Sequence, residues 1–261
     1  MISFRRRDRL KDSVRRSYAA LRPAGKDSRL KRYSLIENKN RREIVLLRGT
    51  GCRWKKCSFC DYHKDCSTDE NANFTLNSSV LDLVTGRYHR LEVIDSGSFP
   101  ELDDKTVRRI IDVCIEKRID TLYFECHYIY RDRIAEIKKL FAGSGITAKA
   151  KLGIETFDAG FRENILMKGI SESDPSRIAE HFDQACLLFG ISGQTEASMR
   201  LDIKTGLDYF ERLCINIMTP NTTPVRPDPH VIETFTDKIF PHIAEDQRID
   251  ILFDNKDFGV G

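Results

Sequence analysis

The chain has 261 residues, of which 40% are hydrophobic and 32% charged, and its formal net charge is +3. This length favours one large domain with a sizeable core over two small ones. Eight cysteines are too few for a secreted scaffold held by disulfides, and the N-terminal segment "MISFRRRDRLKDSVRR" lacks the apolar run of a signal peptide or a membrane span. We therefore expect a cytoplasmic protein with reduced thiols and no membrane partner.

The N-terminal part of the chain is strongly basic. Residues 1–48 carry sixteen Lys or Arg and five Asp or Glu, so the remainder of the chain is acidic overall. Apolar residues recur at helical spacing from Leu10 to Leu21 and predict a helix. We assign residues 1–42 to a basic extension packed on the main domain. Its charge would suit the phosphates of a nucleic acid, but a solvated helix is the simpler interpretation.

From Glu43 onward, short β-rich apolar runs alternate with helix-like segments. The six candidate strands are residues 43–47, 91–95, 121–125, 150–155, 185–191 and 212–218. Amphipathic segments such as 103–118 and 131–145 lie between them. This alternation predicts parallel strands joined by crossover helices, in either an open doubly wound sheet or a partial barrel. Both architectures place the ligand site at the carboxyl ends of the strands.

A group of cysteines directly follows the first predicted strand. Cys52, Cys57 and Cys60 form the pattern C-x4-C-x2-C. Such closely spaced thiolates chelate a metal centre, and zinc and iron–sulfur clusters both qualify. A zinc site would need a fourth ligand, for which Cys66 and His63 are available. A four-iron cluster held by three thiolates would instead keep one iron free to bind a small chelator.

At these cysteines and at several later strand ends, the sequence resembles the radical S-adenosylmethionine (SAM) superfamily. The resemblance runs from about residue 42 to residue 229 and implies an α/β fold, a parallel (β/α)6 partial TIM-like barrel. We assign this barrel and a C-terminal extension to residues 43–261. The resemblance also implies a [4Fe-4S] cluster held by Cys52, Cys57 and Cys60, with SAM as the second cofactor. Most of the superfamily has three residues between the first two cysteines, so the four found here predict a bulge in the loop.

The resemblance assigns further residues to SAM. Phe59 falls where the family places a ring against the adenine, and Tyr62 where a backbone group meets the adenine amine. The segments "DSGSFPE", "LGIET" and "ISGQTEA" resemble the motifs after the second, fourth and fifth strands. The SAM contacts implied there are Ser96, Gly97 and Ser98 for the methionyl amine, Glu155 for the ribose and Ile191 for the adenine. The last motif departs from the family because Phe189 replaces its first glycine.

The remaining polar residues near the strand ends are candidates for binding the substrate. They are Glu125, His127, Asn216, Asn221 and Asp254, together with Phe258 in the C-terminal tail. Carboxylates and amides suit a guanine-like edge, and they equally suit a polyol.

The overall pattern, especially "GTGCRWKKCSFCDYHKD", "EVIDSGSFPEL" and "PNTTPVRPDP", resembles the queuine lyase subgroup of the superfamily. This resemblance implies reductive cleavage of SAM and use of the 5′-deoxyadenosyl radical on queuine, which releases 7-aminomethyl-7-deazaguanine in queuine salvage. The implied partners are a small-molecule substrate, queuine or a related 7-deazaguanine, and a reductant such as flavodoxin or ferredoxin.

Two alternatives stay open at this point. The first is a tRNA-modifying radical SAM enzyme, in which the basic extension would hold RNA. The second is a zinc-binding nucleic-acid module without catalysis, with the three cysteines and either Cys66 or His63 as ligands.

Overall fold

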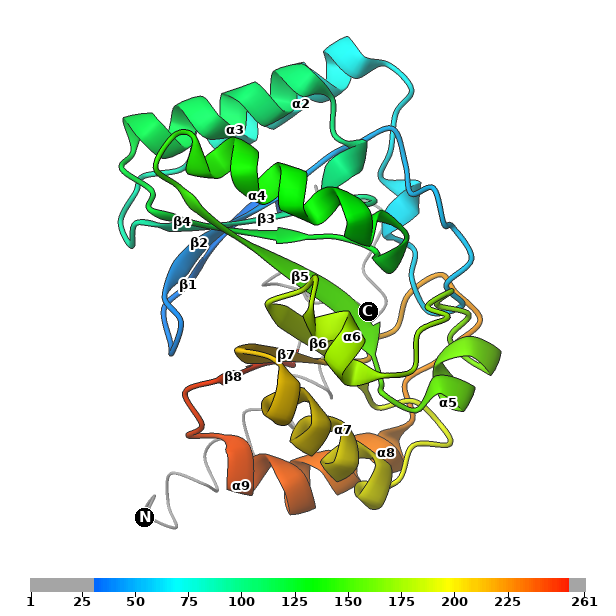
Figure 1. The fold of residues 1–261 in the computed structure, drawn as a ribbon. Helices are drawn as coiled ribbons and strands as arrows, with labels where there is room; N and C mark the ends of the chain where they lie inside the picture. Colours follow the sequence, from blue (N-terminus) through cyan, green and yellow to red (C-terminus); the bar gives the residue numbers. More distant parts are fainter. Residues whose placement is uncertain (1–30, 254–261) are drawn as a thin grey trace.

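The computed structural model describes residues 31–253, which form one curled eight-stranded sheet with helices on its outer side (Figure 1). The strands lie in chain order: β1 (Tyr33–Ile36), β2 (Arg42–Leu47), β3 (Arg90–Asp95), β4 (Thr121–Glu125), β5 (Thr147–Glu155), β6 (Gln184–Phe189), β7 (Arg212–Ile217) and β8 (Ile249–Leu252). β1 pairs with β2 in the antiparallel sense, and every later pair is parallel. The sheet is therefore a half-barrel. The helix predicted near Leu10, and the candidate residues Asp254 and Phe258, lie outside the described residues.

All six predicted strands form, but the prediction of six strands is wrong because the sheet has eight. β1 and β8 were missed because each has only four residues and lies at an edge of the sheet. Short edge strands do not need a long apolar run. β1 also falls inside the predicted basic extension, so this part of the extension is a strand of the sheet. β5 begins at Thr147, three residues earlier than predicted, and a register shift interrupts it between Gly153 and Glu155.

The helices lie on the convex side of the sheet, as the β–α alternation predicts (Figure 1). The longer helices are α2 (Glu70–Leu81), α3 (Asp104–Glu116), α4 (Ile134–Ala142) and α7 (Glu196–Tyr209), and the shorter ones are α5 (Ala159–Asn164), α6 (Pro175–Ala179), α8 (Pro229–Thr234) and α9 (Phe240–Ile243). Short 3-10 helices are η1 (Tyr62–Lys64), η2 (Phe99–Glu101) and η3 (Tyr128–Arg133), and η4 (Phe235–Ile239) is a π-helical turn. Within residues 31–253 no helix is long and apolar enough to cross a membrane.

The concave side of the half-barrel carries buried charges. Leu91 and Val93 of β3 pack into the main hydrophobic core, so Glu92 between them faces the other side of the sheet. There Glu92 forms ion pairs with Arg42 of β2 and Lys151 of β5. Burial alone would raise the pKa of Glu92, but the two cations outweigh burial and lower it to about 2. The pairing across β2, β3 and β5 therefore closes the floor of the half-barrel with charge rather than with apolar packing.

Replacing Glu92 by glutamine keeps the shape of the side chain but removes its negative charge. The two buried cations, Arg42 and Lys151, then lose this ion-pair partner. We expect Glu92→Gln to lower the free energy of unfolding by about 3 kcal/mol at neutral pH, measured by urea denaturation. The folded-state pKa lies below the ordinary value of 4.5, so this contribution is present above about pH 4.5 and is lost as the pH falls toward 2.

The difference between wild type and Glu92→Gln should therefore narrow as the solution is acidified. Glu196→Gln is the control, because Glu196 is 36% exposed and an exposed ion pair contributes less than about 1 kcal/mol. A difference at about pH 3.5 as large as at neutral pH would contradict the ion-pair account.

Candidate active site

The four clustered cysteines lie on a segment between β2 and α2 that we call the cysteine loop (residues 48–67). Its regular structure is limited to the turn η1, so contacts with other parts of the chain determine its position. Gly49 N donates to Ser96 Oγ at 2.9 Å, next to the end of β3. Asn221 Nδ2, in the segment after β7, donates to Phe59 O at 2.6 Å. The loop is thus held at both sides of the half-barrel opening.

The segment after α5 forms a third attachment for the loop. Ser58 donates from its backbone N to Leu166 O at 3.1 Å and from its hydroxyl to Ile165 O at 2.5 Å. Trp54 Nε1 donates to Met167 O at 2.8 Å. Gly169 has φ +71°, and a Cβ there would lie 2.1 Å from the Trp54 ring, so only glycine permits this close packing.

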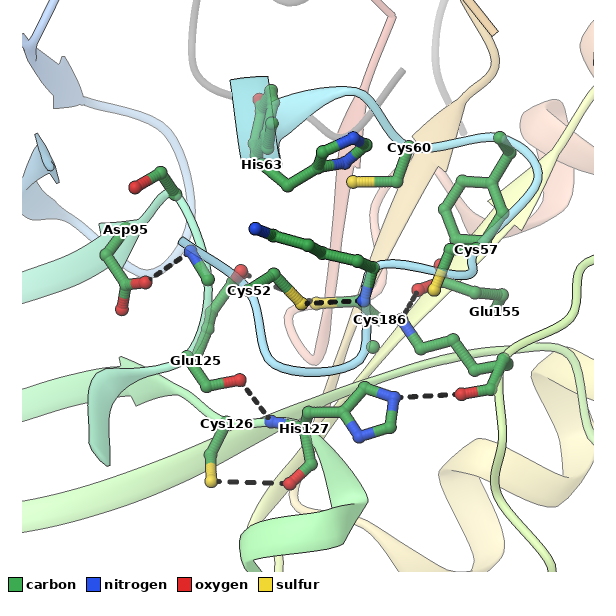
Figure 2. A pocket seen from close by; sticks show the side chains of 18 residues that line it. Cys52, Cys57, Cys60, His63, Asp95, Glu125, Cys126, His127, Glu155 and Cys186 are labelled. Atoms are coloured by element: carbon green, nitrogen blue, oxygen red, sulfur yellow. Dashed lines mark hydrogen bonds and ion pairs between the residues drawn. The ribbon is translucent and has the colours of Figure 1, made fainter. Parts of the chain in front are cut away.

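A cavity lies between the cysteine loop and the strands β3 to β6. Figure 2 shows Cys52, Cys57 and Cys60 on the loop side and Asp95, Glu125 and Glu155 around the cavity. Most of the residues predicted from the sequence to form the site line this cavity: Cys52, Cys57, Phe59, Cys60, Tyr62, Ser96, Gly97, Ser98, Glu125, His127 and Glu155.

Other predicted residues lie elsewhere. Ile191 is buried behind Phe59, in a small apolar cluster, rather than at the cavity surface. Asn216 is 2% exposed on β7 and its Oδ1 lies 3.8 Å from Cys214 Sγ. The Asn221 amide is occupied by Phe59 O and by Thr223, whose N and hydroxyl donate to Asn221 Oδ1. The role of Asn221 seen in the structure is therefore to hold the cysteine loop.

His127 has a structural role that its sequence position did not reveal. Its Nδ1 accepts from Ile129 N at 3.2 Å, which leaves Nε2–H to donate to Lys168 O at 2.8 Å. Burial, and secondly the charge of Lys168, lower the pKa of His127 to about 4. The Trp54 ring stacks on the imidazole at 5.7 Å. His127 is therefore a neutral residue that joins the end of β4 to Lys168 and to the loop.

Glu155 and Lys168 form a buried ion pair at the cavity wall. Glu155 ends β5 with φ +67°, and its Oε1 lies 2.7 Å from Lys168 Nζ. The second oxygen, Oε2, is buried and has no partner among the residues that the structure describes. A Cβ on Gly153 would lie 2.5 Å from Glu155 Oε1. The pair therefore depends on a glycine two residues earlier and leaves one carboxylate oxygen available to a ligand.

Lys168 was not predicted from the sequence. It follows α5, far along the chain from the cysteines, and no helical or strand periodicity marks it. Its Nζ lies 5.4 Å from the centre of the Phe59 ring. Burial alone would lower the pKa of Lys168, but Glu155 in particular raises it well above its ordinary value. Lys168 is therefore a fixed positive charge beside the cysteine thiols.

The backbone of the segment after β3 packs closely against the cysteine loop. A Cβ on Gly97 would lie 2.2 Å from Glu101 Oε2 and 2.9 Å from Gly51 O. The hydroxyls on either side are already used, because Ser96 Oγ accepts from Gly49 N and Ser98 Oγ accepts from His127 N. The serines therefore fix the segment, and the backbone of Gly97 faces the cavity.

Two further carboxylates line the cavity. Asp95 Oδ1 accepts from Gly97 N at 2.5 Å, while its buried Oδ2 has no partner within the described range 31–253. Burial raises the pKa of Asp95 to about 8 against the opposing Gly97 hydrogen bond, with Glu101 and Glu125 adding to the rise. Burial likewise raises the pKa of Glu125, opposed by Lys151 at 3.7 Å. A cationic ligand lowers the pKa of a nearby carboxyl and makes it an acceptor, so these two side chains fit a cationic or N–H-rich ligand.

We compared the chain with known proteins. No protein-family model and no curated protein sequence matches it. Among solved structures, a queuine lyase from Clostridium spiroforme bound to SAM and queuine is 42% identical, with a TM-score of 0.84 over 89% of this chain and 100% of that chain. The chain belongs to the queuine lyase family of radical SAM enzymes. A chitinase from Chromobacterium violaceum also aligns, at 11% identity and a TM-score of 0.31, which is too low to support an argument.

Because the chain belongs to the queuine lyase family, the hypothesis of a zinc-binding module without catalysis is wrong. Within residues 31–253 no three metal-binding side chains lie close enough together to hold a single ion. A tetrahedral zinc site would bring each sulfur to about 2.3 Å from one metal. A four-iron cluster instead spreads its thiolates over separate irons, and Cys52, Cys57 and Cys60 line one cavity, as such a cluster requires.

The cavity also fits the second cofactor of radical SAM queuine lyases. Among residues 31–253, Asp95 Oδ2 and Glu155 Oε2 have no partner, and such oxygens can accept hydrogen bonds from an amine or from ribose hydroxyls like those of SAM. The Gly97 backbone approaches the loop as closely as a glycine allows. Cys66 does not line this cavity. The residues present therefore accommodate three thiolate ligands and SAM at one place.

We expect Gly97→Ala to weaken SAM binding at least tenfold, because the added methyl group displaces the Glu101 carboxylate or the loop. Gly49→Ala is the matched control. A Cβ on Gly49 would meet its nearest neighbour at 3.8 Å, so this variant should bind SAM like the wild type.

The dissociation constant of SAM is measured by isothermal titration calorimetry, with protein reconstituted with iron and sulfide under anaerobic conditions. Equal affinity of the two variants would contradict the role assigned to Gly97.

Proposed function

We propose that this protein cleaves queuine as a radical SAM lyase and releases 7-aminomethyl-7-deazaguanine. The observation that carries the proposal is its 42% identity to a queuine lyase bound to SAM and queuine, which it covers in full. When bound, the cluster and SAM supply the 5′-deoxyadenosyl radical that removes a hydrogen atom from the substrate. The protein holds the reactants, excludes water and provides hydrogen-bond partners.

Cys52, Cys57 and Cys60 are the proposed cluster ligands. Burial raises the pKa of Cys57 and of Cys60, and the nearby Lys168 opposes this effect. A buried thiol becomes a good ligand only when positive charge or a metal favours the thiolate. The positive charge of Lys168 therefore favours the thiolate forms of Cys57 and Cys60, which are the forms that bind a cluster.

The proposed SAM contacts follow from the free acceptors and the apolar wall. The Gly97 backbone and Asp95 Oδ2 receive the methionyl amine, and Glu155 Oε2 receives the ribose hydroxyls. Phe59, which is 1% exposed and supported from behind by Ile191, provides the flat surface for the adenine.

Glu125 is the proposed acceptor for the guanine-like edge of queuine. It ends β4, lines the cavity and lies 3.7 Å from Lys151. A carboxylate can accept two N–H groups from such an edge. Lys151 favours the ionised form of Glu125 against burial. Asp254 and Phe258 stay predictions for the substrate site. The cytoplasmic location of the protein and the division of the chain between residues 42 and 43 also stay predictions.

The proposal is tested by incubating anaerobically reconstituted protein with queuine, SAM and dithionite. We expect 5′-deoxyadenosine and 7-aminomethyl-7-deazaguanine in equal amounts by mass spectrometry. Cys57→Ala should form neither product. Glu125→Gln should raise the KM for queuine about tenfold or more, because the amide replaces a charged acceptor, while its affinity for SAM stays unchanged.

Turnover of queuine within tRNA, without turnover of the free base, would contradict the proposal and favour the tRNA-modifying alternative. An unchanged KM in Glu125→Gln would remove Glu125 from the substrate site without affecting the lyase assignment.

A further inference from the structure

A second hollow lies on the solvent side of the cysteine loop, and we call it the outer groove. It is lined by Thr50 to Arg53 and Lys55 of the loop, by Pro100 and Glu101 of η2, and by Tyr130 and Arg133 of η3. Cys52 and Lys55 line both the outer groove and the inner cavity. Among the three proposed cluster ligands, Cys52 alone lines this groove. The Cys52 backbone is therefore the thin wall between the cluster site and solvent.

The rim of the outer groove is positively charged. Residues 48–64 carry five Lys or Arg and one Asp, although the chain beyond residue 48 is acidic overall. Arg53 and Lys55 are exposed, and the side chain of Arg133 is 52% exposed, with Glu136 3.8 Å away as its ion-pair partner. Three cations thus surround a hollow that ends at Cys52.

The carboxylate within the outer groove is turned toward its own chain. Glu101 accepts from Arg53 N at 2.7 Å, from Tyr130 Oη at 2.7 Å and from Ser98 N at 2.9 Å. These three donors fill three of the roughly four acceptor positions of the carboxylate. Glu101 therefore fixes the shape of the groove, and the exposed charge around it is carried by Arg53, Lys55 and Arg133.

We propose that the outer groove is the docking surface of a small acidic one-electron carrier protein of the flavodoxin type. The inference rests on the proposed function, because the cluster needs an electron before SAM is cleaved. In the docked complex the reduced carrier loses one electron and the cluster gains it, with no transfer of a proton or an atom. A cationic rim steers an acidic partner, and electron-transfer partners typically bind through small, transient interfaces.

The test compares two charge-neutralised variants of the reconstituted enzyme. Arg53→Gln/Arg133→Gln removes two charges from the rim. Arg87→Gln/Lys204→Gln removes two charges from other parts of the surface, where the side chains are 58% and 71% exposed. The probe is an acidic flavodoxin, and its dissociation constant is measured by anaerobic titration calorimetry at low and at high salt.

We expect the rim variant to raise the dissociation constant about tenfold at low salt, with a smaller difference at high salt. The control variant should match the wild type. With reduced flavodoxin as the electron source, the rim variant should form 5′-deoxyadenosine more slowly, whereas with dithionite all three proteins should react at the same rate.

An unchanged dissociation constant in the rim variant, or an equal rise in the control, would overturn the proposal. A rim variant that binds flavodoxin normally but loses affinity for tRNA would also overturn it and make the groove an RNA surface. Slower reaction of the rim variant with dithionite would show that the two arginines act on the cluster site itself. If the wild type fails to convert queuine with dithionite, the proposed function fails independently of the docking result.

Discussion

The position of the cysteine loop is the constraint on which the site depends. The loop holds its three thiols beside the strand ends although its regular structure is the single turn η1. Its backbone is bonded to Ser96 on one side of the opening, to Asn221 on the other, and to Ile165 and Leu166 between them. These segments meet because the strands are parallel and their carboxyl ends share one edge of the sheet. Long-range contacts therefore bring the cysteines to the residues proposed to bind SAM.

The charges of the site are divided between its two sides. The inner cavity presents the carboxylates Asp95, Glu125 and Glu155, which suit the amine and N–H groups of SAM and of a deazaguanine. Lys168 balances one of them and lies beside the thiols. The outer side of the same loop is cationic, which suits an acidic protein rather than a second small substrate. One loop thus separates the carboxylate-lined cavity from the surface proposed to bind an electron carrier.

The sequence predicted the six central strands because each has a continuous apolar run. It pointed to the cysteines through their spacing and to Gly97 through the resemblance of its segment to a radical SAM motif. Four-residue edge strands carry no such run, so β1 and β8 were missed. Lys168 was missed because its role arises from tertiary contact with Glu155, more than ten positions away. Asn221 and His127 have side chains typical of substrate contacts, but both are occupied by the backbone of neighbouring segments. Which polar group stays free depends on the folded arrangement.

The measurement that tests the account most directly uses queuine deuterated on its cyclopentenediol ring, incubated with the reconstituted enzyme, SAM and dithionite. The account predicts that one deuterium appears in 5′-deoxyadenosine, in step with formation of 7-aminomethyl-7-deazaguanine, because the radical removes a hydrogen atom from that ring. Formation of the deazaguanine with no deuterium in 5′-deoxyadenosine would contradict it.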